Sequence, residues 1–323
     1  MPRENILSER ESINPMPAVS VLLPVYNGAR FLNEAVQSIL DQTFRDFELL
    51  AVDDGSSDDS LAILRNFERQ DSRVRVETRE NRGLVFTLNQ LISIAKGQFL
   101  ARMDADDISM PHRFAEQVDF LQIHPEVQLV GTSVTQINAA GLKIGHIRSP
   151  LDHGHIEAQL LDGHCPICHP AVMMRAKAIA EIGGYREEFR DAEDFDLWLR
   201  LSEVGKLANL SESLLLYRLH SGSVSETAGL SQRDATKRAV NEAWTRRGIE
   251  GKFHSDEHWR PDNTSASKHR FALQYGWTAW AHGFTATWRA YAWEAVRTAP
   301  LSPSTWKLIV LGFLRRPDLH NLD

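Results

Sequence analysis

The stretch Gly97-Gln98-Phe99-Leu100-Ala101-Arg102-Met103-Asp104-Ala105-Asp106-Asp107 decides the fold class of this chain. Residues 97–101 form an apolar run that predicts a buried strand, and an acidic turn follows it directly. A second acidic turn, Asp53-Asp54, follows the apolar run 47–52. Because ligands of an open α/β sheet bind outside the carboxyl ends of its strands, the two turns predict one site for a phosphorylated ligand and its metal ion.

Strands and helices alternate around this stretch. Apolar runs at 19–23 and 74–76 predict two more strands, and helical periodicity predicts helices between them. The alternation indicates an α/β fold with a mainly parallel sheet and helices on both faces. Further along the chain we expect a helix to about residue 123, a strand at 127–130, a hairpin or loop over 132–150, helices at 156–161 and 192–204, and a final strand at 213–219.

Charge and tryptophan content set the C-terminal part apart. From Ala228 to Asp323 there are 14 Lys and Arg against 9 Asp and Glu, a net charge of +5, whereas the rest of the chain carries −12. Seven of the eight tryptophans also lie there. We therefore expect a leader over 1–17, a main domain over 18–225 and a mostly helical, Trp-rich, basic region over 226–323. The acidic main domain argues against a nucleic-acid partner, because phosphate backbones attract basic surfaces.

The chain lacks the sequence signals of secretion. No apolar stretch is long enough to span a membrane, and the N-terminus has no basic-then-apolar pattern. Cys165 and Cys168 are too few for a disulfide framework. These features predict a reducing, cytoplasmic location.

Three segments at the ends of predicted strands together resemble family 2 glycosyltransferases. They are residues 19–28 (VSVLLPVYNG), 52–58 (VDDGSSD) and 103–107 (MDADD). The likeness implies a GT-A fold over 18–225, a Rossmann-like mixed sheet with a nucleotide-binding half at 18–110 and an acceptor-binding half at 111–225. It also implies inverting transfer from a nucleotide sugar, a UDP-sugar in the first instance, to a glycan or lipid-linked acceptor. The QxxRW-type signature of processive synthases is not visible, so we expect single-sugar addition during assembly of a cell-surface polysaccharide.

Candidate nucleotide-binding residues lie in the turns after the first two strands. Pro24, Tyr26 and Asn27 belong to a rigid turn, and the Tyr26 ring offers a face on which a base can stack, an interaction of about 1–3 kcal/mol in other proteins. The alternative is an exposed tyrosine in an ordinary turn. Asp53 or Asp54 can accept hydrogen bonds from a base edge or a ribose, and the resemblance implies a base contact for one of them.

Two further expectations concern the neighbouring loops. Whichever of the two aspartates does not contact the base can cap the helix that begins near Ser57. In the loop before the third helix, Gly83 lets the backbone approach a ligand and Arg82 can lie near phosphates, although a surface arginine is the alternative.

Asp104 and Asp106 are candidate ligands for Mg²⁺ or Mn²⁺, which prefer oxygen donors and keep positions for water and phosphate. A solvated acidic turn is the alternative. The resemblance implies that Asp106 binds the metal directly, that Asp104 contacts ribose or acts through water, and that His220 completes the site. A hydrogen-bonded loop histidine is the alternative for His220. Asp107 either caps the helix after Pro111 or has no role.

Glu193 and Asp194 open the helix expected at 192–204. Acids favour the positive end of a helix, so their position needs no chemistry to explain it. The functional alternative is a general base that takes the proton from an acceptor hydroxyl. Residues 193–200 (EDFDLWLR) are similar to the family's Glu-Asp segment, which implies Asp194 as the base and leaves Glu193 as the second candidate.

The segment 164–170 (HCPICHP) allows several interpretations. Cys-x-x-Cys-His is a haem attachment pattern, which the absence of an export signal disfavours, and the segment is crowded for a tetrahedral zinc site. Its similarity to the family implies that His169 lines the acceptor pocket, and we expect Cys165 and Cys168 to be buried or partly buried thiols.

Two other function classes stay open at this point. A sugar-phosphate nucleotidyltransferase uses a similar sheet and metal, but the glycine-rich basic first loop expected there is absent. The other class is a non-catalytic zinc- or sugar-binding interaction module built on Cys165, Cys168 and histidines.

Aromatic residues in the C-terminal region recur at steps of three and four, which predicts one face of a helix. They are Trp277, Trp280, Phe284, Trp288 and Tyr291. Packing against the main domain is the first interpretation. The alternative is peripheral contact with the inner face of the membrane, for which the apolar segment 305–316 with its basic ends is suited.

Overall fold

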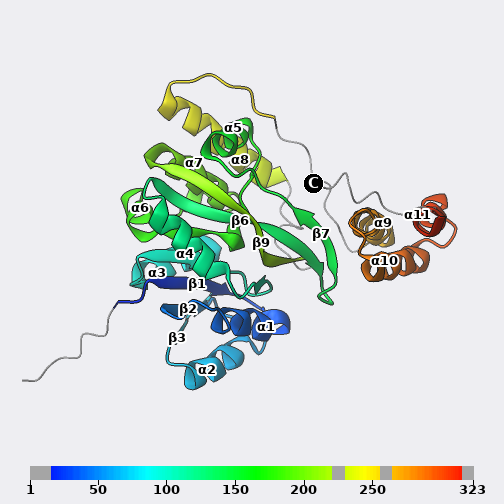
Figure 1. The fold of residues 1–323 in the computed structure, drawn as a ribbon, viewed down its shortest axis with the longest axis horizontal. Coiled ribbons are helices and arrows are strands. Elements are labelled where there is room, and N and C mark those ends of the chain that lie inside the picture. The colour runs from blue at the N-terminus through cyan, green and yellow to red at the C-terminus, as the bar shows by residue number, and fades with distance from the viewer. Residues whose placement is uncertain (1–15, 220–229, 255–263, 315–323) are drawn as a thin grey trace, which may run out of the picture.

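The computed structural model describes residues 16–219, 230–254 and 264–314 (Figure 1). The strands are β1 Val19–Val25, β2 Phe47–Asp53, β3 Val74–Thr78, β4 Phe99–Arg102, β5 Ile108–Ser109, β6 Val127–Asn138, β7 Lys143–Ile147, β8 Met173–Arg175 and β9 Lys206–Leu219. The helices are α1 Ala29–Leu40, α2 Ser60–Gln70, α3 Leu84–Ile94, α4 Arg113–Ile123, α5 His153–Asp162, α6 Ala176–Glu181, α7 Glu193–Val204, α8 Leu230–Arg247, α9 Ser265–Ala281, α10 Thr285–Thr298 and α11 Pro303–Leu314, with short 3-10 turns η1 His169–Ala171 and η2 Glu187–Phe189.

One sheet runs through the molecule in the order β3-β2-β1-β4-β8-β6-β9-β5, and β7 pairs with β6 beside this path. The first four strands are mutually parallel. β8 joins β4 and β6 antiparallel, and β6 and β9 then form a long parallel pair. Helices cover both faces (Figure 1). The prediction of an α/β fold with a mixed sheet is confirmed.

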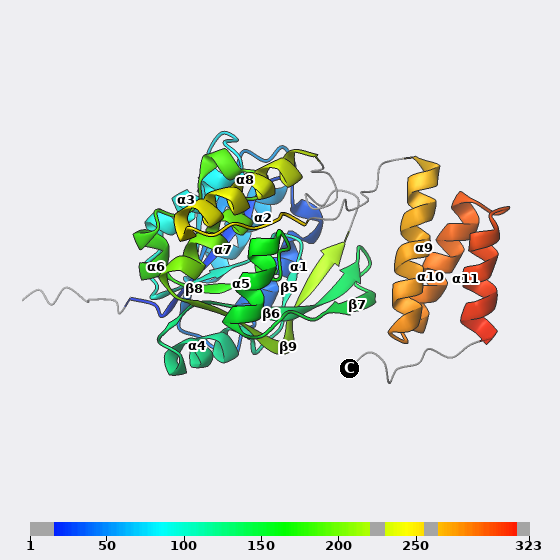
Figure 2. The ribbon, with the colours of Figure 1, turned by 90° about the horizontal axis from the view of Figure 1, so that it is seen from above.

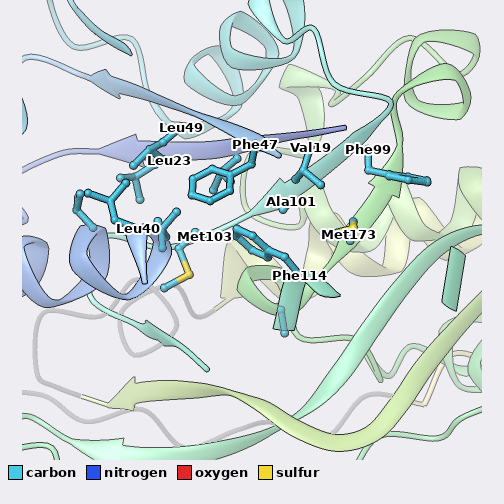
Figure 3. Packing of buried hydrophobic residues seen from close by; sticks show 14 of the residues in the cluster. Val19, Leu23, Leu40, Phe47, Leu49, Phe99, Ala101, Met103, Phe114 and Met173 are labelled. Carbon is cyan, nitrogen blue, oxygen red and sulfur yellow. The ribbon is translucent and has the colours of Figure 1, made fainter. Parts of the chain in front are cut away.

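Alternate residues of the central strands face opposite helical layers. Val21 and Leu23 of β1 pack in the cluster that includes α1, α2 and α4, whereas Leu22 packs in the cluster that includes α3, α5, α7 and α8. Figure 3 shows Phe114 and Met103 inside the first cluster. Because a slip of one residue would turn every side chain to the wrong face, this burial pattern fixes the strand register.

Pro24 ends the pairing between β1 and β4. The Met103 N–H donates to the Leu22 carbonyl oxygen at 3.1 Å. Two residues further along β1, Pro24 faces the same side but has no N–H to donate. The ladder therefore stops there, and residues 104–107 leave the sheet as a turn.

The hairpin expected within 132–150 is present, formed by β6 and β7. Both β6 and β9 are longer than the strands expected at 127–130 and 213–219. In β9 the turn-like residues Ser211 and Glu212 form a bulge, since the pairing moves from Leu210 opposite Thr132 to Ser213 opposite Ser133. A bulge keeps the strand continuous where the sequence resembles a loop.

The helices of the C-terminal region pack in two places. Val240 of α8 belongs to the same cluster as α7, and α8 packs on α5 and α7, the helices of that layer. α9, α10 and α11 form a bundle beside β7 (Figures 1 and 2), where Ile144 and Leu219 pack with Tyr291. The boundary at 226 stays a prediction. None of the described helices is both long and apolar enough to cross a bilayer.

The aromatic stripe expected on one helix is divided between α9 and α10, so that expectation is wrong. Gly283 has a φ of +74° and ends α9. The Gly283 N–H donates to the Trp280 carbonyl and the Phe284 N–H donates to the Ala279 carbonyl, which is a Schellman turn. Tyr291 packs with Ile144 of β7 and Leu219 of β9, which is the expected packing against the main domain, whereas Trp288 is buried among residues of the bundle itself.

Candidate active site

Three turns meet at the carboxyl ends of β1, β2 and β4, which are neighbours in the sheet. The Asn27 side-chain oxygen accepts from the Ser57 N–H at 2.8 Å, and a Cβ on Gly28 would come within 3.1 Å of Ala105. Asn27 has a φ of 50°, a left-handed conformation that asparagine tolerates better than most residues. Tyr26 is 57 % exposed, so its ring is open to a ligand.

Asp54 holds the loop before α3. Its carboxylate accepts the N–H of Arg82 at 2.9 Å and of Gly83 at 2.8 Å, and it is ion-paired with Arg79. The Arg82 guanidinium stacks on Phe86, 3.4 Å from the ring centroid. Asp54 therefore shapes the loop that carries the predicted phosphate-binding residues.

The two carboxylate oxygens of Asp53 differ in their hydrogen bonding. Its Oδ2 accepts from the Thr78 hydroxyl at 2.9 Å, whereas its Oδ1 is buried with no hydrogen-bond partner in the described part of the chain. The expectation that Asp53 or Asp54 caps the following helix is wrong. That helix, α2, begins at Ser60, whose N–H donates to Asp58 at 3.0 Å.

The acidic turn gathers three carboxylates. Oxygens of Asp104, Asp106 and Asp107 lie within 4.8 Å of one another. Burial raises the pKa of Asp104, against the opposing charge of its ion-pair partner Arg102, and raises that of Asp107 further, with the neighbouring carboxylates adding to both shifts. The Asp107 Oδ2 is buried and has no partner among the described residues. Hard oxygen donors with excess negative charge fit Mg²⁺ or Mn²⁺. His220 lies outside the described residues.

Glu193 and Asp194 are the first residues of α7, and their carboxyls lie close enough to the acidic turn to feel the charges of Arg102 and Asp104. Burial raises the pKa of Glu193 to about 8, and the charge of Asp194 adds to it. Burial also raises the pKa of Asp194. A helix N-terminus favours ionised acids, so burial outweighs that effect here. A carboxyl that titrates near neutral pH is suited to general-base chemistry.

This burial predicts a pH-dependent stability change for Glu193→Gln. The folded protein keeps the Glu193 proton up to about pH 8, whereas the unfolded chain releases it near 4.5, so stability falls as pH rises through that interval. Glutamine cannot ionise, and we expect its Tm advantage to grow from pH 5 to pH 9. Each kcal/mol shifts Tm by about 2–4 °C in domains of 150–250 residues, so several degrees are expected.

Differential scanning calorimetry of the metal-free protein measures this. Glu181→Gln is the matched control, because Glu181 is exposed, and it should leave Tm unchanged across the range. An equal Tm for Glu193→Gln and the parent at pH 9 would contradict the burial of this carboxyl.

A buried aromatic cluster lies behind the carboxylates. The His169 Nε2 and the Tyr185 hydroxyl are 2.7 Å apart, and the His169 ring meets Trp198 edge-on at 5.6 Å. Burial lowers the pKa of His169 well below its usual value, which keeps the ring neutral. His169 is only 8 % exposed, and its contact with an acceptor stays a prediction.

Sequence reasoning missed two residues of this site. Arg102 is 3 % exposed and pairs with Asp104, but its place at the end of an apolar strand gave no sign that it points inward. Tyr185 lies in a loop without a motif, yet its hydroxyl feels the charges of Arg102, Asp194 and Asp104. The Gly183-Gly184 pair before it was the available signal of a backbone with special geometry.

Among the described residues the cysteines belong to no group of potential metal ligands. In the described ranges one cluster of three or more His, Cys, Asp or Glu side chains is compact enough to share an ion, and it consists of the three aspartates of the acidic turn. Cys168 is partly buried as expected, but Cys165 is exposed, which corrects the expectation of a buried thiol. Even so, the surrounding protein withdraws the Cys165 sulfur from water, which raises the pKa of the thiol, and the charge of Asp194 adds to the shift. A thiol held in its protonated form is a poor zinc ligand.

A separate open hollow of about 410 Å³ lies on α8. Its arginines are already engaged: Arg186 pairs with Asp196 and Glu242, and Arg246 pairs with Glu203. It holds none of the predicted site residues, so we place the candidate site at the strand ends.

Comparison with known proteins gives three results. The family model "Glycosyl transferase family 2" matches residues 20–183. The putative glycosyltransferase EpsE of Bacillus subtilis (strain 168) is 37 % identical over 211 residues, covering 64 % of this chain and 74 % of that protein. The O-antigen biosynthesis glycosyltransferase WbnJ of Escherichia coli is 34 % identical over 221 residues, covering 67 % and 85 %.

The fold also has solved counterparts. The structure of S. aureus TarS 1–349 in complex with UDP-GlcNAc superimposes with a TM-score of 0.60 at 15 % identity, covering 87 % of this chain and 88 % of that one. At this identity the likeness shows a common fold, and TarS therefore supports the GT-A architecture expected from the sequence.

Proposed function

Because the chain belongs to glycosyltransferase family 2, we propose that it transfers a sugar from a UDP-sugar to a hydroxyl of a glycan or lipid-linked acceptor, with inversion at the anomeric carbon. The observation that best supports this is the meeting of the acidic turn, the Asn27 turn and the Asp53 turn at three adjacent strand ends, with Asp194 in electrostatic reach of Asp104.

The two other function classes are set aside. Family membership and the named relatives identify a glycosyltransferase, which excludes the nucleotidyltransferase and the non-catalytic module as the primary activity. A non-catalytic module that binds zinc through Cys165, Cys168 and histidines would also need a cluster of these ligands, and the described residues contain none.

In the proposed binding mode the nucleotide lies across the carboxyl ends of β1 and β2. The exposed Tyr26 stacks on the base, and the unused Asp53 Oδ1 accepts from the base edge. Arg82 and Gly83, held by Asp54, border the phosphates. Asp106 and Asp104 would hold Mg²⁺ or Mn²⁺, which when bound supplies neutralisation of the charge on the departing diphosphate. His220 is proposed as a third ligand on the family resemblance alone.

Asp194 is the proposed general base, with Glu193 as the second candidate. The acceptor oxygen attacks the anomeric carbon from the side opposite the diphosphate, and its proton passes to the Asp194 carboxylate. The bond from that carbon to the diphosphate breaks, and its electron pair leaves with the diphosphate. A single displacement inverts the configuration. His169, beside Tyr185, is the proposed wall of the acceptor site.

We place the reaction in the assembly of a cell-surface polysaccharide, on the cytoplasmic side. The support is the relative named for O-antigen biosynthesis, which shares 34 % identity. The oligomeric state is left open.

A thermal-shift screen of nucleotides tests the function. UDP and UDP-sugars should raise Tm in the presence of Mn²⁺ and much less in EDTA, since a ligand at 100 times its Kd adds about 2.7 kcal/mol of stability. ADP, GDP and CDP serve as controls for the base. Stabilisation by a nucleoside triphosphate with release of pyrophosphate from a sugar phosphate would contradict the proposal.

The bundle α9–α11 has a surface suited to an anionic membrane, and we propose peripheral docking there. Trp306, Val310 and Leu314 recur along α11 and are 51 %, 48 % and 77 % exposed. Residues 264–314 contain five Lys and Arg and a single acid, Glu294, whereas the whole chain is acidic. Exposed apolar residues among cations fit an anionic lipid surface, and the charge argues for lipid over a neutral partner.

Vesicle co-sedimentation tests this surface. We expect the protein to bind phosphatidylglycerol vesicles more strongly than phosphatidylcholine vesicles, and Val310→Glu/Leu314→Glu to weaken binding at least about tenfold, because two apolar insertions are lost and two negative charges added. Ile123→Glu, a 73 % exposed apolar position on α4, is the matched control. Unchanged binding by the double variant, or a dimer that only the double variant disrupts, would contradict membrane docking.

A further inference from the structure

Arg218, near the end of β9, joins the acidic turn to two other segments, α1 and β6. Its backbone N–H donates to the Asp107 Oδ1 at 2.8 Å, and its Nε donates to the Asp106 carbonyl oxygen at 2.7 Å. The far side of its guanidinium is ion-paired with Glu34 of α1 at 2.6 Å and donates to the Asn138 carbonyl of β6 at 3.3 Å. Arg218 is 2 % exposed.

These contacts constrain the backbone that carries Asp106. The Arg218 Nε holds the peptide that follows Asp106, and the Arg218 N–H holds the side chain of the next residue. β5 then pairs with β9 directly after the turn, with Ile108 opposite Leu216. The acidic turn is therefore anchored to β9 on its C-terminal side, while Arg102 pairs with it on the other side.

A planar guanidinium is suited to this arrangement. Its donors point in fixed directions, so one side chain can hold Asp106, Asn138 and Glu34 at the same time. A lysine retains the positive charge but offers one nitrogen, which cannot span these acceptors. The guanidinium also lies over the Phe31 ring of α1, 4.4 Å from its centroid, which limits its movement.

We propose that Arg218 is a positioning residue that fixes Asp106 for the divalent cation, and that Asp107 is the anchor of Arg218 rather than a ligand. The inference depends on the proposed metal-dependent transfer. The sequence left Asp107 as a cap of the helix after Pro111 or as a residue without a role. That helix, α4, has no side-chain cap, and the Asp107 Oδ1 accepts from the Arg218 N–H instead. A ligand role would use its Oδ2 instead.

Mn²⁺ affinity of the full chain tests the role of Arg218, with free Mn²⁺ followed by electron paramagnetic resonance and no nucleotide present. Arg218→Lys should weaken Mn²⁺ binding by about 10–100-fold, the usual effect of losing a residue that orients a metal ligand. Glu34→Gln is the matched control. It removes only the ion pair to the 62 % exposed Glu34 side chain and should stay within about twofold of the parent.

Two readouts separate positioning from loss of structure. UDP affinity in EDTA should be unchanged in Arg218→Lys, and high Mn²⁺ should restore its kcat. Equal Mn²⁺ affinity in Arg218→Lys and the parent, or an equal loss in Glu34→Gln, would overturn the inference. A parent protein that binds no Mn²⁺ would instead overturn the proposed metal dependence.

Asp107 variants decide between anchor and ligand, and they keep the test informative if Arg218→Lys does not fold. Asp107→Asn retains an oxygen for the Arg218 N–H and should keep Mn²⁺ affinity within about threefold, whereas Asp107→Ala should lose it as Arg218→Lys does. If both Asp107 variants lose most of their Mn²⁺ affinity, Asp107 is a metal ligand. If neither loses any, Asp107 does not anchor Arg218. Each result contradicts the inference.

Discussion

Asp106→Asn is expected to lower the rate of sugar transfer by about 10²–10³-fold, the size of effect seen when one electrostatic contact to a developing charge is removed. The asparagine oxygen can still approach a cation, but the charge that holds it is gone. Burial raises the pKa of Asp104 and of Asp107, which favours their protonated forms, so these carboxyls cannot replace it fully. The rate is measured with a verified donor and acceptor at saturating Mn²⁺.

The matched control is Asp119→Asn, which changes an exposed acid on α4 and should leave the rate unaltered. UDP binding by Asp106→Asn in EDTA should equal that of the parent, which shows that the nucleotide half of the site is intact. A parental transfer rate in Asp106→Asn would remove the acidic turn from the mechanism.

Asp194→Asn is expected to reduce kcat by about 10²–10⁴-fold, the range that a positioned general base contributes, with little change in donor affinity. The base acts only when ionised, and burial raises the pKa of Asp194, so the parental rate should increase with pH over an interval above the usual titration range of an aspartate. The residual rate of Asp194→Asn should lack this increase. Rates at several pH values and donor titrations give both quantities.

Neighbouring acids provide the controls for this prediction. Asp191→Asn, just before α7, should keep the parental rate. Glu193→Gln should lose less than Asp194→Asn. A larger loss for Glu193→Gln would transfer the role of base to Glu193, and full activity in both variants would contradict a carboxylate base at the start of α7.

The sequence predicts the strand ends and their acidic turns because burial and period-two alternation act locally. Val21 and Leu23 face one layer and Leu22 the other, as an apolar run ended by a proline implies. The same local logic places Asp54 at the end of β2 but cannot show that its oxygens are used by the N–H groups of residues 82 and 83, since that contact joins distant segments.

Other features of the structure could not be predicted from the sequence, because long-range packing determines them. Arg102 looks like the end of a strand, and only the fold brings it among the carboxylates. Ser211 and Glu212 look like a turn, and only pairing with β6 keeps them within β9. The helix break at Gly283 was also not predicted, but here a local signal was present, because a glycine between aromatic residues indicates a helix end.

The most direct measurement of the central claim is a manganese anomalous difference map from crystals grown with Mn²⁺ and UDP. We expect one peak beside the Asp106 carboxylate, with the uracil on Tyr26 and its edge at Asp53. A peak remote from residues 104–107, or uridine bound away from the ends of β1 and β2, would contradict it.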